Sequence, residues 1–199
     1  MAAQGGPVAR TAVGERDHLS LWLAEATREP TTSVELWRQH PQLPRRLRTG
    51  LTFDAVLAEG ALVATAIAIL QVYEQPVGPV IVYPYLGCAA VLVPCGTAAR
   101  WSELTAHWPS KTPRPLCLGQ GHALQVPPPS PRGTTVPARW LKPPDPEQII
   151  GETPLLTNPS ALTRCLAEAR ALLTTGAEPK PLQRAVGAVR SALRAPKRT

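Results

Sequence analysis

Two acidic residues in the segment RTGLTFDAVLAEG (48–60) are of the type that binds metal ions. Asp54 lies within an apolar run and Glu59 lies at its end. Carboxylates two residues apart on a β-strand point to the same face, where a pair can hold two divalent metal ions about 3.5–4 Å apart. The residues two positions from Asp54 are Thr52 and Val56, and an unpaired carboxylate is a poor cation site. We therefore predict that this segment holds no metal.

Both acids also have a structural interpretation. A single aspartate in an apolar strand commonly caps a loop or pairs with an arginine, and Arg45, Arg46 and Arg48 lie nearby in the sequence. Glu59 immediately precedes an apolar segment that predicts a helix, where a carboxylate favours the helix N-terminus electrostatically. We expect these structural roles, and Asp54 and Glu59 are the only remnant candidates for catalysis.

The segment GQGHA (119–123) is the candidate for phosphate contact. Gly119 and Gly121 would let backbone N–H groups approach a phosphate, and His122 would contact it. A tight turn between two short strands explains the same glycines, and a single histidine has many structural roles. Both interpretations stay open from the sequence.

Cysteine spacing argues against zinc. Cys88, Cys95, Cys117 and His122 are separated by seven, twenty-two and five positions, which fits no zinc knuckle or ribbon. The N-terminus has no apolar signal core, so we expect buried, reduced thiols in a cytoplasmic protein. No Ser-His-Asp or Cys-His arrangement and no P-loop is readable from the spacing, and no cofactor is predicted.

Positive charge is concentrated near the C-terminus. The 199-residue chain has a net charge of +7, of which +5 belongs to residues 176–199. Cations on a short amphipathic helix neutralise phosphates independently of base sequence. We therefore predict nucleic-acid binding by Lys180, Arg184, Arg190, Arg194, Lys197 and Arg198.

Two other interpretations of this basic segment remain. Arginine outnumbers lysine 17 to 4, so codon usage in a GC-rich genome and a solvated helix would explain the charge. The apolar stripe of the same helix would also suit a protein partner. Arg139 and Lys142 flank Trp140 and are further candidates for a nucleic-acid surface, whereas Trp22, Trp37, Trp101 and Trp108 are expected in the core.

Periodicity and turn residues predict the elements that position these side chains. The second helix is expected to be capped by Thr31, Thr32 or Ser33 and to end at Pro41. Helices are predicted at 12–28, 31–40, 60–71, 96–108, 160–173 and 182–199, and strands at 51–58, 78–85, 87–94, on both sides of 119–121 and at 134–144.

This order of elements predicts an α+β fold with a mixed β-sheet and flanking helices. We divide the chain into an N-terminal helical segment (1–28), an α+β domain (29–157) and C-terminal helices with the basic tail (158–199). The longest apolar run, 60–70, is too short for a bilayer, which needs about 20 residues, so no membrane contact is expected.

An ordered set of motifs resembles the N-terminal domain of actinobacterial bifunctional DNA primase/polymerases. It runs over residues 25–145 and comprises TREPTTSVELWRQHPQ, RTGLTFDAVLA, GPVIVYPYLGCAAVLVP, PLCLGQGHALQVPPPS and RWLKPP. The resemblance implies an RRM-like α+β core flanked by a second small α+β unit. It also implies nucleotide and template binding, with divalent metal as cofactor.

The chain departs from this family at two chemical positions. The family's strand has acids at the positions of Asp54, Leu57 and Glu59, and leucine cannot ligate metal. The family's phosphate-contacting histidine on the second hairpin strand corresponds to Ala89 or Ala90. The departures predict loss of the chemistry but not of the fold.

We therefore expect a non-catalytic protein that binds DNA and serves as an accessory or regulator of DNA replication, on a plasmid or integrative element as the resemblance implies. One alternative is an active primase/polymerase that uses Asp54, Glu59 and divalent metal. Another is a protein-interaction scaffold that binds no nucleic acid.

Overall fold

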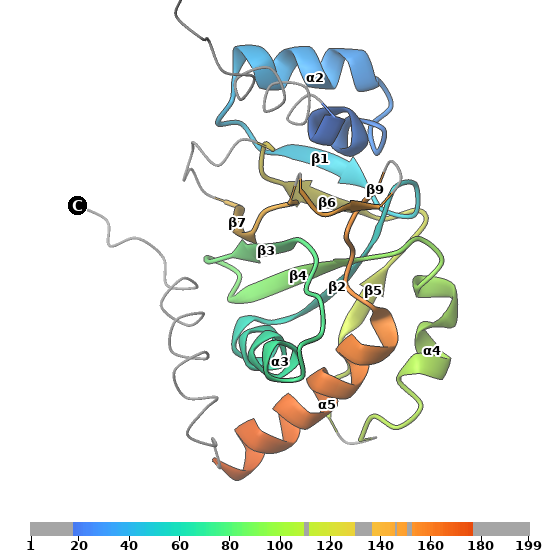
Figure 1. Cartoon of the computed structure of the whole chain (residues 1–199), viewed down its shortest axis with the longest axis vertical. Helices are drawn as coiled ribbons and strands as arrows, with labels where there is room; N and C mark the ends of the chain where they lie inside the picture. Colours follow the sequence, from blue (N-terminus) through green and yellow to red (C-terminus); the bar gives the residue numbers. More distant parts are fainter. Residues whose placement is uncertain (1–17, 110–111, 130–136, 146, 151–152, 177–199) are drawn as a thin grey trace, which may run out of the picture.

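The computed structural model describes residues 18–109, 112–129, 137–145, 147–150 and 153–176 (Figure 1). A helical segment at 18–24 precedes the named elements. These are α2 (Pro30–Gln39), β1 (Arg45–Arg48), β2 (Asp54–Glu59), α3 (Gly60–Val72), β3 (Val80–Tyr83), β4 (Cys88–Val93), η1 (Ala98–Arg100), α4 (Trp101–Leu104), β5 (Leu116–Leu118), β6 (Ala123–Val126), β7 (Arg139–Lys142), β8 (Ile149–Ile150), β9 (Thr153–Pro154) and α5 (Pro159–Thr175). The predicted α+β class is confirmed.

The main sheet has five strands in the order β5-β2-β4-β3-β7, and every neighbouring pair is antiparallel. The prediction of a mixed sheet is therefore wrong for the described residues. Helix α3 does return the chain so that β2 and β3 run in the same direction. Strand β4 lies between them and pairs antiparallel with both, because the predicted hairpin folds β4 back onto β3.

Four of these strands form two interleaved crossovers. Helix α3 connects β2 to β3, and η1 with α4 connects β4 to β5. In the order β5-β2-β4-β3, strand β4 lies between β2 and β3, the strands of the first crossover. Strand β2 lies between β5 and β4, the strands of the second crossover. This is the split βαβ arrangement, with β7 added beyond β3.

One face of the sheet packs against α3 and α5, which cross below it in Figure 1. Helix α3 is apolar on all sides, so it has to be buried all round, and its residues from Leu62 to Leu70 are inaccessible. Helix α5 starts where Asn158 Oδ1 accepts hydrogen bonds from the N–H groups of Ser160 and Ala161, and it ends at Gly176 with a φ of 68°. We call this apolar interior the helix-side core.

The opposite face of the sheet packs against a second layer, here called the upper core. The two-stranded sheet β1–β6 and the helices at 18–24 and α2 cover it, above the main sheet in Figure 1. Trp22 and Phe53 meet inside it with ring centroids 5.7 Å apart. Side chains from the predicted N-terminal segment (1–28) and from the predicted C-terminal segment (158–199) thus pack in the same cores as side chains from the predicted domain 29–157. The domain boundaries stay a prediction.

Two helix predictions are wrong in their bounds. The predicted helix at 96–108 is only η1 and α4, which end at Leu104. The Thr105 hydroxyl donates to the Trp101 carbonyl oxygen at 2.7 Å, and such local bonds compete with helix continuation.

Helix α2 begins at Pro30 rather than after a Thr or Ser cap. Glu29 is its N-cap residue and makes no side-chain cap bond. Proline at the first helical position is pre-organised for the helix. Ser33 instead lies inside the helix, buried, and its hydroxyl donates to Thr27 Oγ1.

The two strands beside 119–121 belong to different sheets. Strand β5 pairs with β2, whereas β6 pairs with β1, a strand that the sequence analysis did not anticipate. The basic helix predicted at 182–199 lies outside the described residues. Among those described, no helix combines the length and the apolar composition that a bilayer span requires.

Candidate functional site

The carboxylate of Asp54 is bound by backbone and not by a cation. Asp54 is 1 % exposed, and its Oδ2 accepts a hydrogen bond of 2.8 Å from the N–H of Ala98, the first residue of η1. The predicted pairing with Arg45, Arg46 or Arg48 is therefore wrong, whereas the predicted cap of a loop matches this contact. The carboxylate fixes the beginning of the second crossover on the central strand β2.

The three family positions on β2 do not converge. Alternation along the strand places Asp54 on the helix side with Val56, and Leu57 on the opposite side, where it packs against the upper core. Glu59 is exposed, and its Oε2 lies 3.6 Å from Nη1 of Arg170 on α5. Asp54 would thus not face an acid at position 57 even if one were present.

The positions of the family's histidine are also apolar and closed. Ala89 and Ala90 are both 0 % exposed on the central part of β4, where Ala89 faces the helix-side core and Ala90 faces the upper core. A histidine at either position would have to displace packed side chains.

The predicted phosphate loop divides into a buried end and an exposed end. Gly119 is buried, and its carbonyl oxygen accepts a hydrogen bond of 2.6 Å from the Thr49 hydroxyl. A methyl group at Gly119 would lie 2.5 Å from the Ala98 Cβ, so this glycine is needed for packing. Gly121 has a φ of 89°, and it and His122 are exposed.

Gly121 and His122 open onto a cleft of about 680 Å³, here called the arginine cleft. It lies between the turn that precedes α2, strand β1 and the loop that leads into β6. Its charged and titratable lining side chains are Arg28, Glu29, Arg45, Arg46, Arg48 and His122. The remaining lining residues, Thr27, Ser33, Gly121 and Ala123, are small.

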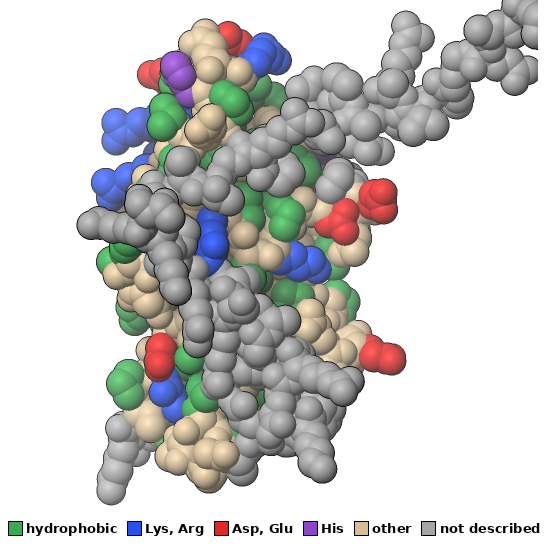
Figure 2. Space-filling view, turned by 90° about the vertical axis from the view of Figure 1, so that its left-hand side faces the viewer, with side chains coloured by type: hydrophobic (Ala, Val, Ile, Leu, Met, Phe, Trp, Pro, Cys, Tyr) green, Lys and Arg blue, Asp and Glu red, His purple; other side chains and the backbone are tan. Residues whose placement is uncertain are grey.

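Strand pairing holds these cations in place. Leu47 is fully buried between Arg46 and Arg48, so the two arginines project from the other face of β1, opposite Gln125 and Ala123 of β6. The N–H of Arg48 donates to the Ala26 carbonyl oxygen at 2.8 Å, which joins β1 to the turn that carries Arg28. Basic side chains project from the left edge of the upper half of Figure 2.

The cations of the cleft are not neutralised by neighbours. Within the described part of the chain, no ion pair or side-chain hydrogen bond involves Arg28, Arg45, Arg46 or Arg48. Glu29 is the one acid in the lining, so the cleft carries a formal charge of about +3. Four arginines that line one open hollow suit the binding of an anion.

Sequence reasoning missed the arginine cleft, although a signal was present. In the motif RRLR, Arg46 and Arg48 flank Leu47, and a period of two predicts that these two arginines share the charged face of a strand. Their closeness to Asp54 in the sequence favoured pairing with that acid instead. Arg28 carries no signal of its own, because only the turn between two helices brings it to β1.

The other predicted nucleic-acid contacts are less accessible. Arg139 and Lys142 are half-buried on β7, and Lys142 Nζ donates to the Val77 carbonyl oxygen. Trp140 is half-buried as well, with its N–H bonded to the Pro128 carbonyl oxygen at 2.9 Å. Whether Trp140 flanks a nucleic-acid surface stays a prediction. Lys180, Arg184, Arg190, Arg194, Lys197 and Arg198 lie outside the described residues.

The four thiols are free but not all buried. Cys165 is buried and Cys95 is exposed, which corrects the prediction for Cys95. Burial, followed by the negative charge of Asp54, raises the pKa of Cys117 to about 12. Among the described residues, no three His, Cys, Asp or Glu side chains come together as a metal site.

Comparisons with protein-family models, with curated proteins and with solved structures found no match to this chain. Function therefore has to be argued from the arrangement of its own residues.

Proposed function

We propose that this protein is a non-catalytic nucleic-acid-binding accessory or regulator of DNA replication, built on a primase/polymerase-like fold. The plasmid or integrative-element setting follows from the resemblance in its motifs and is part of the proposal. The cytoplasmic location expected in the sequence analysis is also part of the proposal.

The topology supports the fold part of this proposal. An RRM-like core is a split βαβ sheet, and β5-β2-β4-β3 with its two crossovers has that strand order. The β1–β6 sheet with α2 supplies a second small α+β layer, as the resemblance implies. Likeness of fold alone carries no activity.

The chemistry of β2 favours a non-catalytic role. Asp54 is buried and caps η1, Leu57 packs against the upper core, and Glu59 pairs with Arg170. Two-metal catalysis needs carboxylates that face one shared position. These three side chains point to different places.

The single observation that carries the binding role is the arginine cleft. Its four arginines have no partner among the described residues, and guanidinium groups form paired hydrogen bonds with phosphate oxygens. The cleft lies apart in the sequence from the basic tail. It would therefore be a second binding surface beside the one predicted for the tail. Both surfaces would bind nucleic acid through its backbone, with little base preference.

Fluorescence anisotropy with labelled single-stranded and duplex DNA tests the proposal. If four phosphates of a single strand are neutralised, raising the salt concentration from 50 to 200 mM should weaken binding roughly 50-fold. The Arg46→Gln/Arg48→Gln variant and a chain that lacks residues 177–199 should each bind more weakly. Absence of binding at low salt would refute the proposal, and unchanged binding by the shortened chain would count against the tail.

A primer-synthesis assay with magnesium or manganese separates this proposal from an active enzyme. We expect no product. Synthesis that disappears in Asp54→Ala but persists in Glu103→Gln, a surface control on α4, would overturn the non-catalytic assignment. Retention of a protein partner without any nucleic acid would instead support a scaffold role.

A further inference from the structure

The arginine cleft differs from an ordinary basic surface in how its cations are placed. The lining comes from three separate segments: the turn before α2 supplies Arg28, β1 supplies three arginines, and the loop before β6 supplies His122. Cations that track a continuous backbone lie along a ridge or a long groove. Cations around a hollow instead concentrate positive charge on one compact anion.

The lining also indicates which part of a nucleic acid enters. Among the described residues, the lining holds no Phe, Tyr, Trp or large apolar side chain, and His122 is its one ring. Single strands that bind through their bases stack successive bases on several aromatic side chains, whereas this lining is dominated by four arginines. Recognition through phosphate therefore fits the lining better than recognition through bases.

The charge of the cleft favours a terminal phosphate over an internal one. A phosphate monoester carries about −1.5 to −2 charges at neutral pH, with three strong acceptor oxygens. An internal phosphodiester carries one charge and offers fewer free oxygens. Four guanidinium groups opposed by Glu29 match the more highly charged monoester better.

The volume is compatible with this ligand. A cleft of about 680 Å³ falls within the usual range for small-molecule sites, about 300–1,000 Å³. It can hold a phosphate with part of its sugar and several waters. Because the cleft is open to solvent, the rest of the strand can leave it without steric conflict.

We propose that the arginine cleft binds the terminal phosphate monoester of a nucleic-acid strand. The inference rests on the proposed nucleic-acid binding and assigns it a specific ligand group. Arg46 and Arg48 of β1 and Arg28 of the neighbouring turn line the site, and His122 lies at the exposed end of the loop.

The test compares oligonucleotides of one sequence, internally labelled, that carry a 5′-phosphate, a 3′-phosphate or hydroxyl groups at both ends. The full chain should bind one of the phosphorylated strands about tenfold more tightly than the hydroxyl strand. This preference should disappear in Arg46→Gln/Arg48→Gln. Arg28→Gln, from a different segment of the lining, provides an independent second variant.

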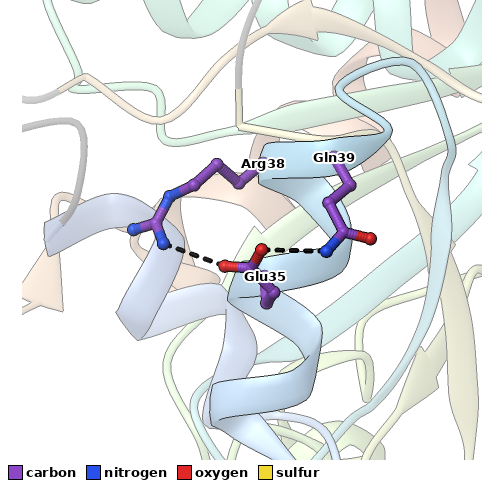
Figure 3. Close-up of polar contacts among 3 residues, drawn as sticks. All are labelled: Glu35, Arg38 and Gln39. Carbon is purple, nitrogen blue, oxygen red and sulfur yellow. Dashed lines mark hydrogen bonds and ion pairs between the residues drawn. The ribbon is translucent and has the colours of Figure 1, made fainter.

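Arg38→Gln is the matched control. Arg38 lies on α2 outside the cleft lining, and its guanidinium bonds to Glu35 Oε2 at 2.9 Å, beside a bond from Gln39 to the other oxygen (Figure 3). The substitution removes one positive charge without changing the cleft. We expect the end preference to persist. Thermal unfolding of every variant checks that the fold is retained.

The outcomes separate the inference from the function on which it rests. Equal affinity for all three strands, or an end preference that survives both cleft variants, would overturn the inference alone. No binding of any strand at low salt would overturn both. The last outcome is competition by inorganic pyrophosphate or a deoxynucleoside triphosphate at lower concentrations than the phosphorylated strand. It would overturn the inference, because the ligand of the cleft would then be a free phosphate compound and not a strand end.

Discussion

The carboxylate Oδ2 of Asp54 accepts a hydrogen bond of 2.8 Å from the backbone N–H of Ala98. The bond joins the first residue of the central strand β2 to the first residue of η1, 44 positions later in the chain. It gives Oδ2 of the buried side chain a partner and satisfies a free N–H at the helix start, whereas Oδ1 has no hydrogen-bond partner among the described residues. Asp54, which lies at a position that resembles a catalytic one, thus stabilises the start of η1.

Replacement of Asp54 should lower stability more than it alters binding. Asp54→Ala leaves the Ala98 N–H without its partner, and we expect a loss of about 1–3 kcal/mol in the free energy of unfolding. Asp54→Asn retains an acceptor oxygen and should lose less. Urea denaturation measures both, and Glu59→Gln, at the exposed pair with Arg170, should change stability by less than about 1 kcal/mol. Equal stability of Asp54→Ala and the unmodified chain would contradict this role.

Gly119 should be required because of its contact with Ala98. A Cβ at position 119 would lie 2.5 Å from the Ala98 Cβ, so Gly119→Ala should cost about 1–3 kcal/mol through overpacking. Removal of the opposing methyl group tests the cause. The double variant Gly119→Ala/Ala98→Gly should recover part of the loss, measured as a coupling energy in a double-mutant cycle. Purely additive losses would show that the clash is not the reason.

Thr157 should anchor the segment before α5 to the main sheet. It is 0 % exposed, its hydroxyl oxygen accepts a hydrogen bond of 2.8 Å from the N–H of Gly78, and its own N–H donates to the Leu92 carbonyl oxygen. Thr157→Val keeps the shape but leaves the Gly78 N–H unpaired, with an expected cost of about 1–3 kcal/mol. Thr157→Ser keeps the hydroxyl and should lose less in the same denaturation experiment. The reverse order would contradict the anchoring role.

Thiol reactivity should follow exposure and pKa. Burial raises the pKa of all four thiols, that of Cys117 to about 12 and that of Cys165 to about 11, and Cys95 is the one exposed thiol. Only the thiolate is nucleophilic, so iodoacetamide at pH 8 should label Cys95 first in the folded chain. As long as the pH is below the pKa of Cys117, the rate at which this thiol is labelled should rise about tenfold for each unit by which the pH is increased. Mass spectrometry of labelled peptides measures the order, and fastest labelling of Cys165 would contradict it.

The same raised pKa values predict a loss of stability in alkali. A thiol whose pKa is higher in the folded than in the unfolded chain favours folding below the unfolded value of 9.0, and this contribution is lost as the pH rises toward the folded value. The unfolding free energy should therefore fall from about pH 9 toward pH 12. Replacement of Cys117 by serine should reduce this dependence.

Much of the central sheet could be predicted from local patterns. The strand at 51–58, the apolar helix at 60–71 and the hairpin each have a clear composition, and they correspond to β2, α3, β3 and β4. Helix bounds were less accurate, as for the helix expected at 96–108, where α4 ends at Leu104. The prediction of a mixed sheet was wrong, because the relative direction of neighbouring strands depends on which strands pair, and contacts between distant segments decide that pairing.

The sequence by itself determined that Leu57 lies where the family it resembles has an acid, and that Arg46 and Arg48 flank Leu47. These facts depend on residue type and on a period of two. Only the tertiary structure decided that Asp54 binds the Ala98 N–H and that Arg28, Arg46, Arg48 and His122 line one cleft. The reason is that a buried carboxylate takes whichever donor the fold brings to it, and distant segments meet only when β1 pairs with β6.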